Sequence, residues 1–177
     1  MAPMSRVHRR TKETEVEVEL ELEGRGDTAI ATGIPFLDHM LNLFAAHGFF
    51  DLKITARGDL EVDQHHTVED IGICLGQAFR EALQKRPGFR RYGAAQVPMD
   101  LSNRPFLHFQ VQIPPGLAAL DPQMVKEFWR AVSVHGGMTL HIHAPYGDNT
   151  HHILEAIFKA AGRALDQATQ PEPRAKG

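Results

Sequence analysis

The chain contains the same motif twice: two histidines, two intervening residues and a glutamate, at His65–Glu69 and again at His151–Glu155. Counted from the first histidine of each motif, both copies have a glycine eleven residues on and an alanine thirteen residues on. Upstream, His47-Gly48 matches His135-Gly136. Agreement at fixed offsets indicates an internal duplication, so the fold must be one that two similar units can build together.

The duplication also pairs His39 with Glu127, each eight residues before the histidine of the matching His-Gly pair. We place the first repeat at residues 1–88 and the second at 89–177, and expect both to form one compact domain. Each half is too small to bury both of its faces, although 42% of the chain is apolar. We therefore expect an α+β fold in which the helices of both repeats pack together between, or against, two sheets.

Hydrophobic periodicity predicts the elements of each half. Residues 15–23 alternate strictly between glutamate and an apolar side chain, which is typical of a strand, and the turn at 24–27 predicts that 28–32 returns as its hairpin partner. The patterns predict further strands at 51–57, 106–113 and 139–144, and helices at 35–44, 65–84, 122–134 and from 151 onward.

Composition excludes several classes of protein. The net charge is −3 with both signs mixed, which gives no electrostatic case for a nucleic-acid partner, and we expect the basic cluster at 6–12 to be local and mobile. No apolar run approaches membrane-spanning length, and the first residues lack the apolar core of a signal peptide. The one cysteine, Cys74, lies in an apolar run that indicates core packing and suits a reducing cytoplasm.

The histidine motifs favour metal binding. On a helix, His65 and Glu69 share one face, whereas His66 is turned about 100° away, so two neighbouring imidazoles cannot easily share one ion. Each half also offers one donor from its first helix. The eight donors could hold two ions with four protein ligands each; they are His39, His65, His66, Glu69, Glu127, His151, His152 and Glu155.

Imidazole and carboxylate ligands without thiolate suit manganese, iron, nickel or zinc. Asp38 precedes His39 and Asp70 follows Glu69, so each of these acids adjoins a predicted ligand and could orient an imidazole. An exposed acid in the first turn of a helix is the other interpretation for both.

Longer runs carry a resemblance to a known family. Residues 33–41, 58–70, 91–93, 139–141 and 149–156 are similar to imidazoleglycerol-phosphate dehydratases, and the similarity extends from about Arg9 to Leu165. The resemblance implies a hydro-lyase of histidine biosynthesis that converts imidazole glycerol phosphate to imidazole acetol phosphate with two manganese ions in each active site. It implies a duplicated α/β unit of the ribosomal protein S5 domain 2-like type, with a four-helix bundle between two mixed sheets. It also implies a homo-oligomeric shell of 24 subunits with active sites between subunits.

The resemblance further implies roles for residues. One ion takes His39, His66, His151 and Glu155, and the other takes His65, Glu69, Glu127 and His152. Glu127 stands where many relatives have histidine. Glu13 is the candidate acid/base, His47 a second candidate for proton transfer, and Glu155 counts as catalytic as well as a ligand. The residues expected to bind the substrate phosphate are Arg91, Arg104, Lys159 and Lys176.

The chain departs from the family pattern at two places. After Asp100 it lacks a short segment, so we expect the first strand of the second half to be abbreviated or lost, and its C-terminus is also shortened. The residues alone leave two other functions open. A dinuclear metal hydrolase could use the same ligands to activate water, and a non-catalytic metal-binding assembly protein would need only the two histidine motifs.

Overall fold

The structure, a computed structural model, describes residues 4–86, 88–94, 97–114 and 120–174. Its first half contains β1 (Met4–Arg10), β2 (Thr14–Glu21), β3 (Thr28–Ala31), α1 (Pro35–Gly48), β4 (Asp51–Gly58) and α2 (His65–Gln84). Its second half contains β5 (Tyr92–Gly93), β6 (Met99–Asp100), β7 (Phe106–Val111), α3 (Pro122–Gly136), β8 (Thr139–Ala144) and α4 (Thr150–Thr169).

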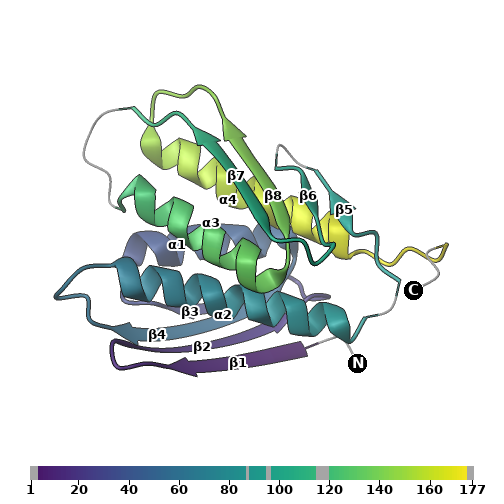
Figure 1. Ribbon diagram of the computed structural model, residues 1–177, viewed down its shortest axis with the longest axis horizontal. Coiled ribbons are helices and arrows are strands. Elements are labelled where there is room, and N and C mark those ends of the chain that lie inside the picture. Colours follow the sequence, from purple (N-terminus) through teal and green to yellow (C-terminus); the bar gives the residue numbers. More distant parts are fainter. Residues whose placement is uncertain (1–3, 87, 95–96, 115–119, 175–177) are drawn as a thin grey trace.

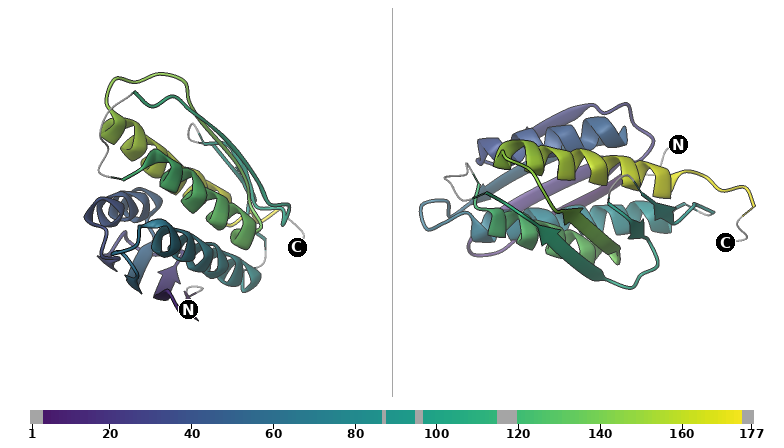
Figure 2. Two further views of the ribbon diagram at one scale, coloured as in Figure 1. Left: turned by 60° about the vertical axis from the view of Figure 1, so that its left-hand side comes forward. Right: turned by 90° about the horizontal axis from the view of Figure 1, so that it is seen from above.

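The helices lie between two sheets. Figure 1 shows α1 and α2 on the sheet formed by β1 to β4, and α3 and α4 against the sheet formed by β5 to β8. The left view of Figure 2 shows the same stacking from another side, and the right view looks down on it from above. This confirms the predicted bundle of helices between two mixed sheets.

The two sheets have the same topology. Their strand orders are β1-β2-β4-β3 and β5-β6-β8-β7, and in each the first two pairings are antiparallel while the last is parallel. The duplication predicted from matching offsets is therefore present in the fold. The abbreviation after Asp100 is also confirmed, because β5 and β6 have two residues each where β1 and β2 have seven and eight.

The predicted hairpin between 15–23 and 28–32 is wrong. β3 pairs in parallel with β4, with Ile30 opposite Ile54, while β2 pairs with β1 and β4. The loop between β2 and β3 is held at the start of β4, where Asp51 Oδ1 accepts hydrogen bonds from the amides of Arg25 at 2.7 Å and Asp27 at 2.9 Å. These bonds fix the loop at the start of β4, so that β3 lies along the edge of β4 opposite to β2.

The expectation of a mobile basic cluster at 6–12 is also wrong, because residues 4–10 form the edge strand β1. Ser5 and Val7 are buried, and the basic side chains of Arg6 and His8, which alternate with them, face glutamates of β2. Arg6 pairs with Glu17 of β2, and Arg9 pairs with Asp70 of α2 at 2.9 Å. Arg6 and His8 thus match the glutamate row of β2, whereas Arg9 matches an acid of α2.

The helices follow the predicted ranges closely. α2 begins and ends as predicted, α1 continues to Gly48, and α3 continues to Gly136. Asp121 caps α3 by accepting a hydrogen bond from the amide of Gln123 at 2.8 Å, and Asn149 caps α4 through the amide of His152 at 3.1 Å. The caps place the predicted ligands in the first two turns of their helices.

Glycines set how closely the helices approach. A Cβ on Gly76 would lie 2.8 Å from the amide nitrogen of Gly136, and a Cβ on Gly162 would lie 3.1 Å from that of Gly48. The two matching glycine positions of the repeat therefore meet the two His-Gly pairs. Each crossing joins the first helix of one half to the second helix of the other, α3 to α2 and α1 to α4.

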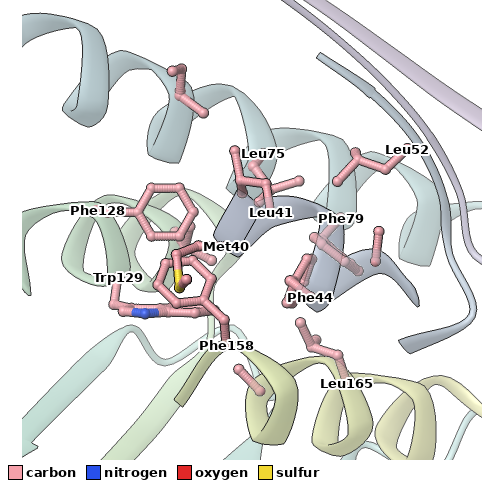
Figure 3. Packing of buried hydrophobic residues seen from close by; sticks show 14 of the residues in the cluster. Met40, Leu41, Phe44, Leu52, Leu75, Phe79, Phe128, Trp129, Phe158 and Leu165 are labelled. Carbon is pink, nitrogen blue, oxygen red and sulfur yellow. The ribbon is translucent and has the colours of Figure 1, made fainter. Parts of the chain in front are cut away.

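Aromatic side chains from all four helices fill the space between these pairs (Figure 3). The ring centroids of Trp129 and Phe158 lie 5.0 Å apart, and those of Phe44 and Trp129 lie 6.0 Å apart. Phe79 of α2 contacts Phe44 edge to face at 6.0 Å. Cys74 is buried in the same core, as predicted.

Candidate metal and active site

Three predicted ligands meet where α1 crosses α4. His39 Nε2 lies 2.9 Å from Glu155 Oε1, and His151 Nε2 lies 3.5 Å from the same oxygen. One ligand atom from each lies within 4.8 Å of the other two, and this is the one group of three or more such side chains found among the described residues. His151 and Glu155 share a face of α4. The close approach of α1 to α4 at Gly48 and Gly162 brings His39 next to them.

The carboxylate of Glu155 is kept in its charged form by its neighbours, which suits it to bind a cation. The hydrogen bond from His39 is the largest cause that lowers the pKa of Glu155, and the charges of Lys159 and His151 lower it further. Lys159 Nζ lies 3.6 Å from Glu155 Oε2. Glu155 is therefore an anion at neutral pH, next to two imidazoles that are each about half exposed.

The corresponding predicted ligands on α2 and α3 lie on neighbouring helices, but their side chains do not form a cluster like that of His39, His151 and Glu155. His65 Nε2 lies 3.6 Å from Glu69 Oε2 on one face of α2. Glu127, which corresponds to His39, lies on the neighbouring helix α3 and pairs with Arg130 at 3.3 Å. Its carboxylate does not join a cluster with His65 and Glu69 among the described residues.

The rings of the two adjacent histidines in each motif are nearly perpendicular to each other. The rings of His65 and His66 are 84° apart, and those of His151 and His152 are 89° apart. His152 is exposed and does not belong to the cluster that His151 joins. Because adjacent residues of a helix are about 100° apart, each motif offers ligands on two faces of its helix.

Asp59 orients His66, and the sequence interpretation missed this contact. Asp59 Oδ2 lies 2.9 Å from His66 Nδ1, which leaves Nε2 as the nitrogen suited to coordinate an ion. The hydrogen bond with Asp59 is the largest cause that raises the pKa of His66, and the charges of Asp63 and Glu13 add to it. Asp59 stands within the 58–70 run that carries the family resemblance, which is the signal that could have identified it.

Glu13 lies on the same side of the molecule as His66. It is exposed in the turn between β1 and β2 and, with Asp59, lines a surface hollow of about 320 Å³. His47 lies two turns after His39 on α1, where its Nδ1 lies 2.9 Å from the carbonyl oxygen of Leu43. The chain thus brings Glu13 near the α2 ligands but does not bring His47 to the cluster.

The predicted phosphate contacts fall in two separate regions. Lys159 adjoins the cluster, whereas Arg91 and Arg104 both face Asp100, at 3.7 Å and 3.2 Å. The amide of Arg91 donates to the carbonyl of Ala168, which is about 20 Å further along α4 than Glu155. Lys176 lies outside the described residues.

Asp38 and Asp70 bind other groups than an imidazole. Asp38 Oδ1 accepts hydrogen bonds from the amide and hydroxyl of Thr32, the former at 2.9 Å. Asp70 is 7% exposed and binds Arg9 and Thr14. Both predicted interpretations, an orienting partner for histidine and an exposed acid, are therefore wrong for Asp70.

Comparison with known proteins decides the family. The family model for imidazoleglycerol-phosphate dehydratase matches residues 32–165. The chain belongs to the imidazoleglycerol-phosphate dehydratase family. It is 56% identical to the imidazoleglycerol-phosphate dehydratase of Syntrophobacter fumaroxidans, covering 97% of this chain and 92% of that protein. It is 52% identical to that of Geobacter sp. (strain M21), covering 100% of this chain and 96% of the relative.

Solved structures of imidazoleglycerol-phosphate dehydratases have the same fold. The enzyme from Staphylococcus aureus aligns with a TM-score of 0.84 at 35% identity, covering 96% of this chain and 99% of that one. The Pyrococcus furiosus enzyme, in complex with (S)-C348, aligns with a TM-score of 0.85 at 38% identity, covering 97% of each chain. These matches confirm the resemblance, the fold and the hydro-lyase class predicted from the sequence. Separately, none of the described helices is long and apolar enough to span a membrane.

Proposed function

We propose that this member of the family removes water from imidazole glycerol phosphate to give imidazole acetol phosphate, using two manganese ions in each active site. The observation that carries the metal site is the convergence of His39, His151 and Glu155 on the family fold. Two imidazoles and one anionic carboxylate, without thiolate, form a donor set that manganese accepts. The lowered pKa of Glu155 keeps its carboxylate charged, which supports binding of a cation there.

We infer two ligand sets from the family resemblance. The first contains His39, His66, His151 and Glu155, and the second contains His65, Glu69, Glu127 and His152. The helical step of about 100° between the histidines of each pair supports their division between two ions. The exchange of helices between halves supports a set that draws His39 from one half and His151 from the other.

The active sites would lie between subunits of a homo-oligomer, for which the family resemblance suggests a shell of 24 copies. His66 is bound to Asp59 and stands outside the cluster of its own chain. Arg91 and Arg104 lie toward the far end of α4 from Glu155. A neighbouring copy would bring both groups to a cluster that one chain leaves incomplete.

The proposed reaction takes one carbon-bound proton and one hydroxyl group from the glycerol chain as water, and the resulting enol becomes a ketone when a proton moves from oxygen to carbon. Bound manganese would supply the electrophile that draws electron density from the substrate imidazole. Glu13 would accept and return the proton, with His47 as a weaker candidate. Lys159, Arg91, Arg104 and Lys176 would hold the phosphate.

The same ligands would suit a dinuclear hydrolase or a metal-binding assembly protein, so the test must separate the three. Metal-stripped protein would be reloaded with Mn²⁺ and incubated with imidazole glycerol phosphate. We expect imidazole acetol phosphate to form without release of inorganic phosphate. Release of phosphate would indicate a hydrolase, and full metal loading without any product would indicate an assembly protein; either result contradicts the proposal.

A further inference from the structure

The turn that carries Glu13 is tied directly to the helix that carries the first histidine motif. Thr14 Oγ1 donates a hydrogen bond to Asp70 Oδ2, and Arg9 Nε donates to Asp70 Oδ1 at 2.9 Å. Asp70 is the residue after Glu69 on α2. One buried carboxylate therefore joins β1 and the start of β2 to α2, at the residue that follows Glu69.

The turn itself is held by a second threonine. The amide of Thr11 donates to the carbonyl of Thr14 at 2.9 Å. Thr11 Oγ1 accepts from the amides of Glu13 at 3.1 Å and Thr14 at 2.9 Å. The backbone of Glu13 is thus fixed within the turn, and the turn is fixed to α2 through Thr14.

The burial of these groups makes the connection rigid. Thr14 is 4% exposed and Asp70 is 7% exposed, so water cannot easily replace either partner. Hydrogen bonds to an ionised acceptor are about twice as strong as neutral ones, and a buried acceptor that loses its donor is costly. Asp70 has a guanidinium on one oxygen and a hydroxyl on the other, which satisfies both.

We propose that Thr14, Asp70 and Arg9 are positioning residues that fix the Glu13 carboxylate relative to the ligands on α2. The inference rests on the proposed role of Glu13 in proton transfer. Proton transfer requires the acid or base to stand within hydrogen-bond reach of the reacting atom, and a displacement of about 1 Å can lower the rate about 100-fold. Glu13 itself is exposed, so its position depends on the backbone turn that Thr14 anchors.

A merely structural role would be to hold the first sheet on α2, and the chain offers a matched control for it. Ser5, in β1, is 1% exposed and donates a hydrogen bond to the carbonyl of Ala78 in α2 at 2.8 Å. This bond also joins the sheet to α2, but Ser5 lies at the opposite end of β1 from the Glu13 turn. Ser5→Ala therefore removes a comparable anchor without touching the turn.

The experiment compares Thr14→Val, Thr14→Ser and Ser5→Ala in the manganese-loaded protein. Thr14→Val should lower kcat by about 10- to 100-fold, with less change in KM and unchanged manganese content. Thr14→Ser keeps a hydroxyl and should recover most of the activity, while Ser5→Ala should keep kcat close to that of the parent. Hydrogen exchange at the amides of Glu13 and Thr14 should rise about tenfold in Thr14→Val alone.

Equal kcat in Thr14→Val and the parent would overturn the inference. It would also be overturned if Ser5→Ala lost as much activity as Thr14→Val, because both effects would then reflect general loosening of the sheet. Glu13→Gln tests the underlying role separately. If that variant keeps the parent kcat, the proposed role of Glu13 fails, whatever Thr14→Val does to hydrogen exchange.

Discussion

His39 Nε2 lies 2.9 Å from Glu155 Oε1, although 116 residues separate them along the chain. The contact exists because α1 of the first half crosses α4 of the second, where Gly162 approaches the backbone of Gly48. The duplication therefore exchanges helices between the halves. A metal ligand set drawn from both halves follows directly from this exchange.

Glu155→Gln should reduce manganese binding. The amide loses the negative charge that His39, His151 and Lys159 surround, and we expect the affinity of at least one ion to fall by more than about 10-fold. Equilibrium binding of Mn²⁺ measures the change. Glu172→Gln serves as the control, because Glu172 pairs with Arg174 after the end of α4. Equal manganese affinity in the Glu155 variant and its control would remove Glu155 from the ligand set.

Asp59→Asn should weaken manganese binding through His66, by about 10- to 100-fold at one ion. In metal-free protein the pKa of His66 should also fall, because the hydrogen bond and charge of Asp59 are the main causes that raise it. An NMR titration of the imidazole measures this shift. Glu61→Gln, which changes an exposed carboxylate two residues on, should leave both quantities unchanged. A His66 titration that is the same in parent and Asp59→Asn would show that Asp59 does not control this imidazole.

Gly162→Ala should destabilise the fold. The new Cβ would lie 2.3 Å from the carbonyl oxygen of Phe44, so the α1–α4 crossing must open, at a cost of about 1–3 kcal/mol. Gly76→Ala, the matching position at the α2–α3 crossing, should cost a similar amount. Chemical denaturation measures both. Stabilisation by alanine, the usual effect of this change at an uncrowded helical site, would contradict the close approach.

Cys74 should be unreactive in the folded protein. Burial raises the pKa of its thiol from an ordinary 9.0 to about 12. Since the folded pKa is raised, the associated stability is present below pH 9 and is lost as the pH rises from 9 toward 12. A thiol reagent at pH 8 should label Cys74 only after denaturant is added. Rapid labelling of the native protein would contradict burial of this side chain.

The sequence was sufficient for features that depend on local pattern. Apolar spacing and capping residues such as Asp121 and Asn149 act within a few residues, so the four helices were predicted closely. The matching offsets counted from His65 and from His151 predicted the duplication, which the two sheets of equal strand order show.

Features that depend on distant partners were not predictable. The parallel pairing of β3 with β4 is set by the loop that Asp51 holds, and β1 looked mobile because its partners, Glu17 and Asp70, lie elsewhere in the sequence. The link between Asp59 and His66 joins a loop to a helix at a distance that no periodicity encodes. How neighbouring copies complete the site likewise depends on contacts outside one chain.

The proposed two-manganese dehydratase is tested most directly by titrating metal-free protein with Mn²⁺. Bound ions per chain and formation of imidazole acetol phosphate are measured in the same samples. We predict that two ions bind per chain in the assembled protein and that the rate reaches its maximum only when both are bound. In His39→Ala, binding should fall to one ion, with loss of activity. Full activity in metal-free protein, or two bound ions with no product, would contradict the account.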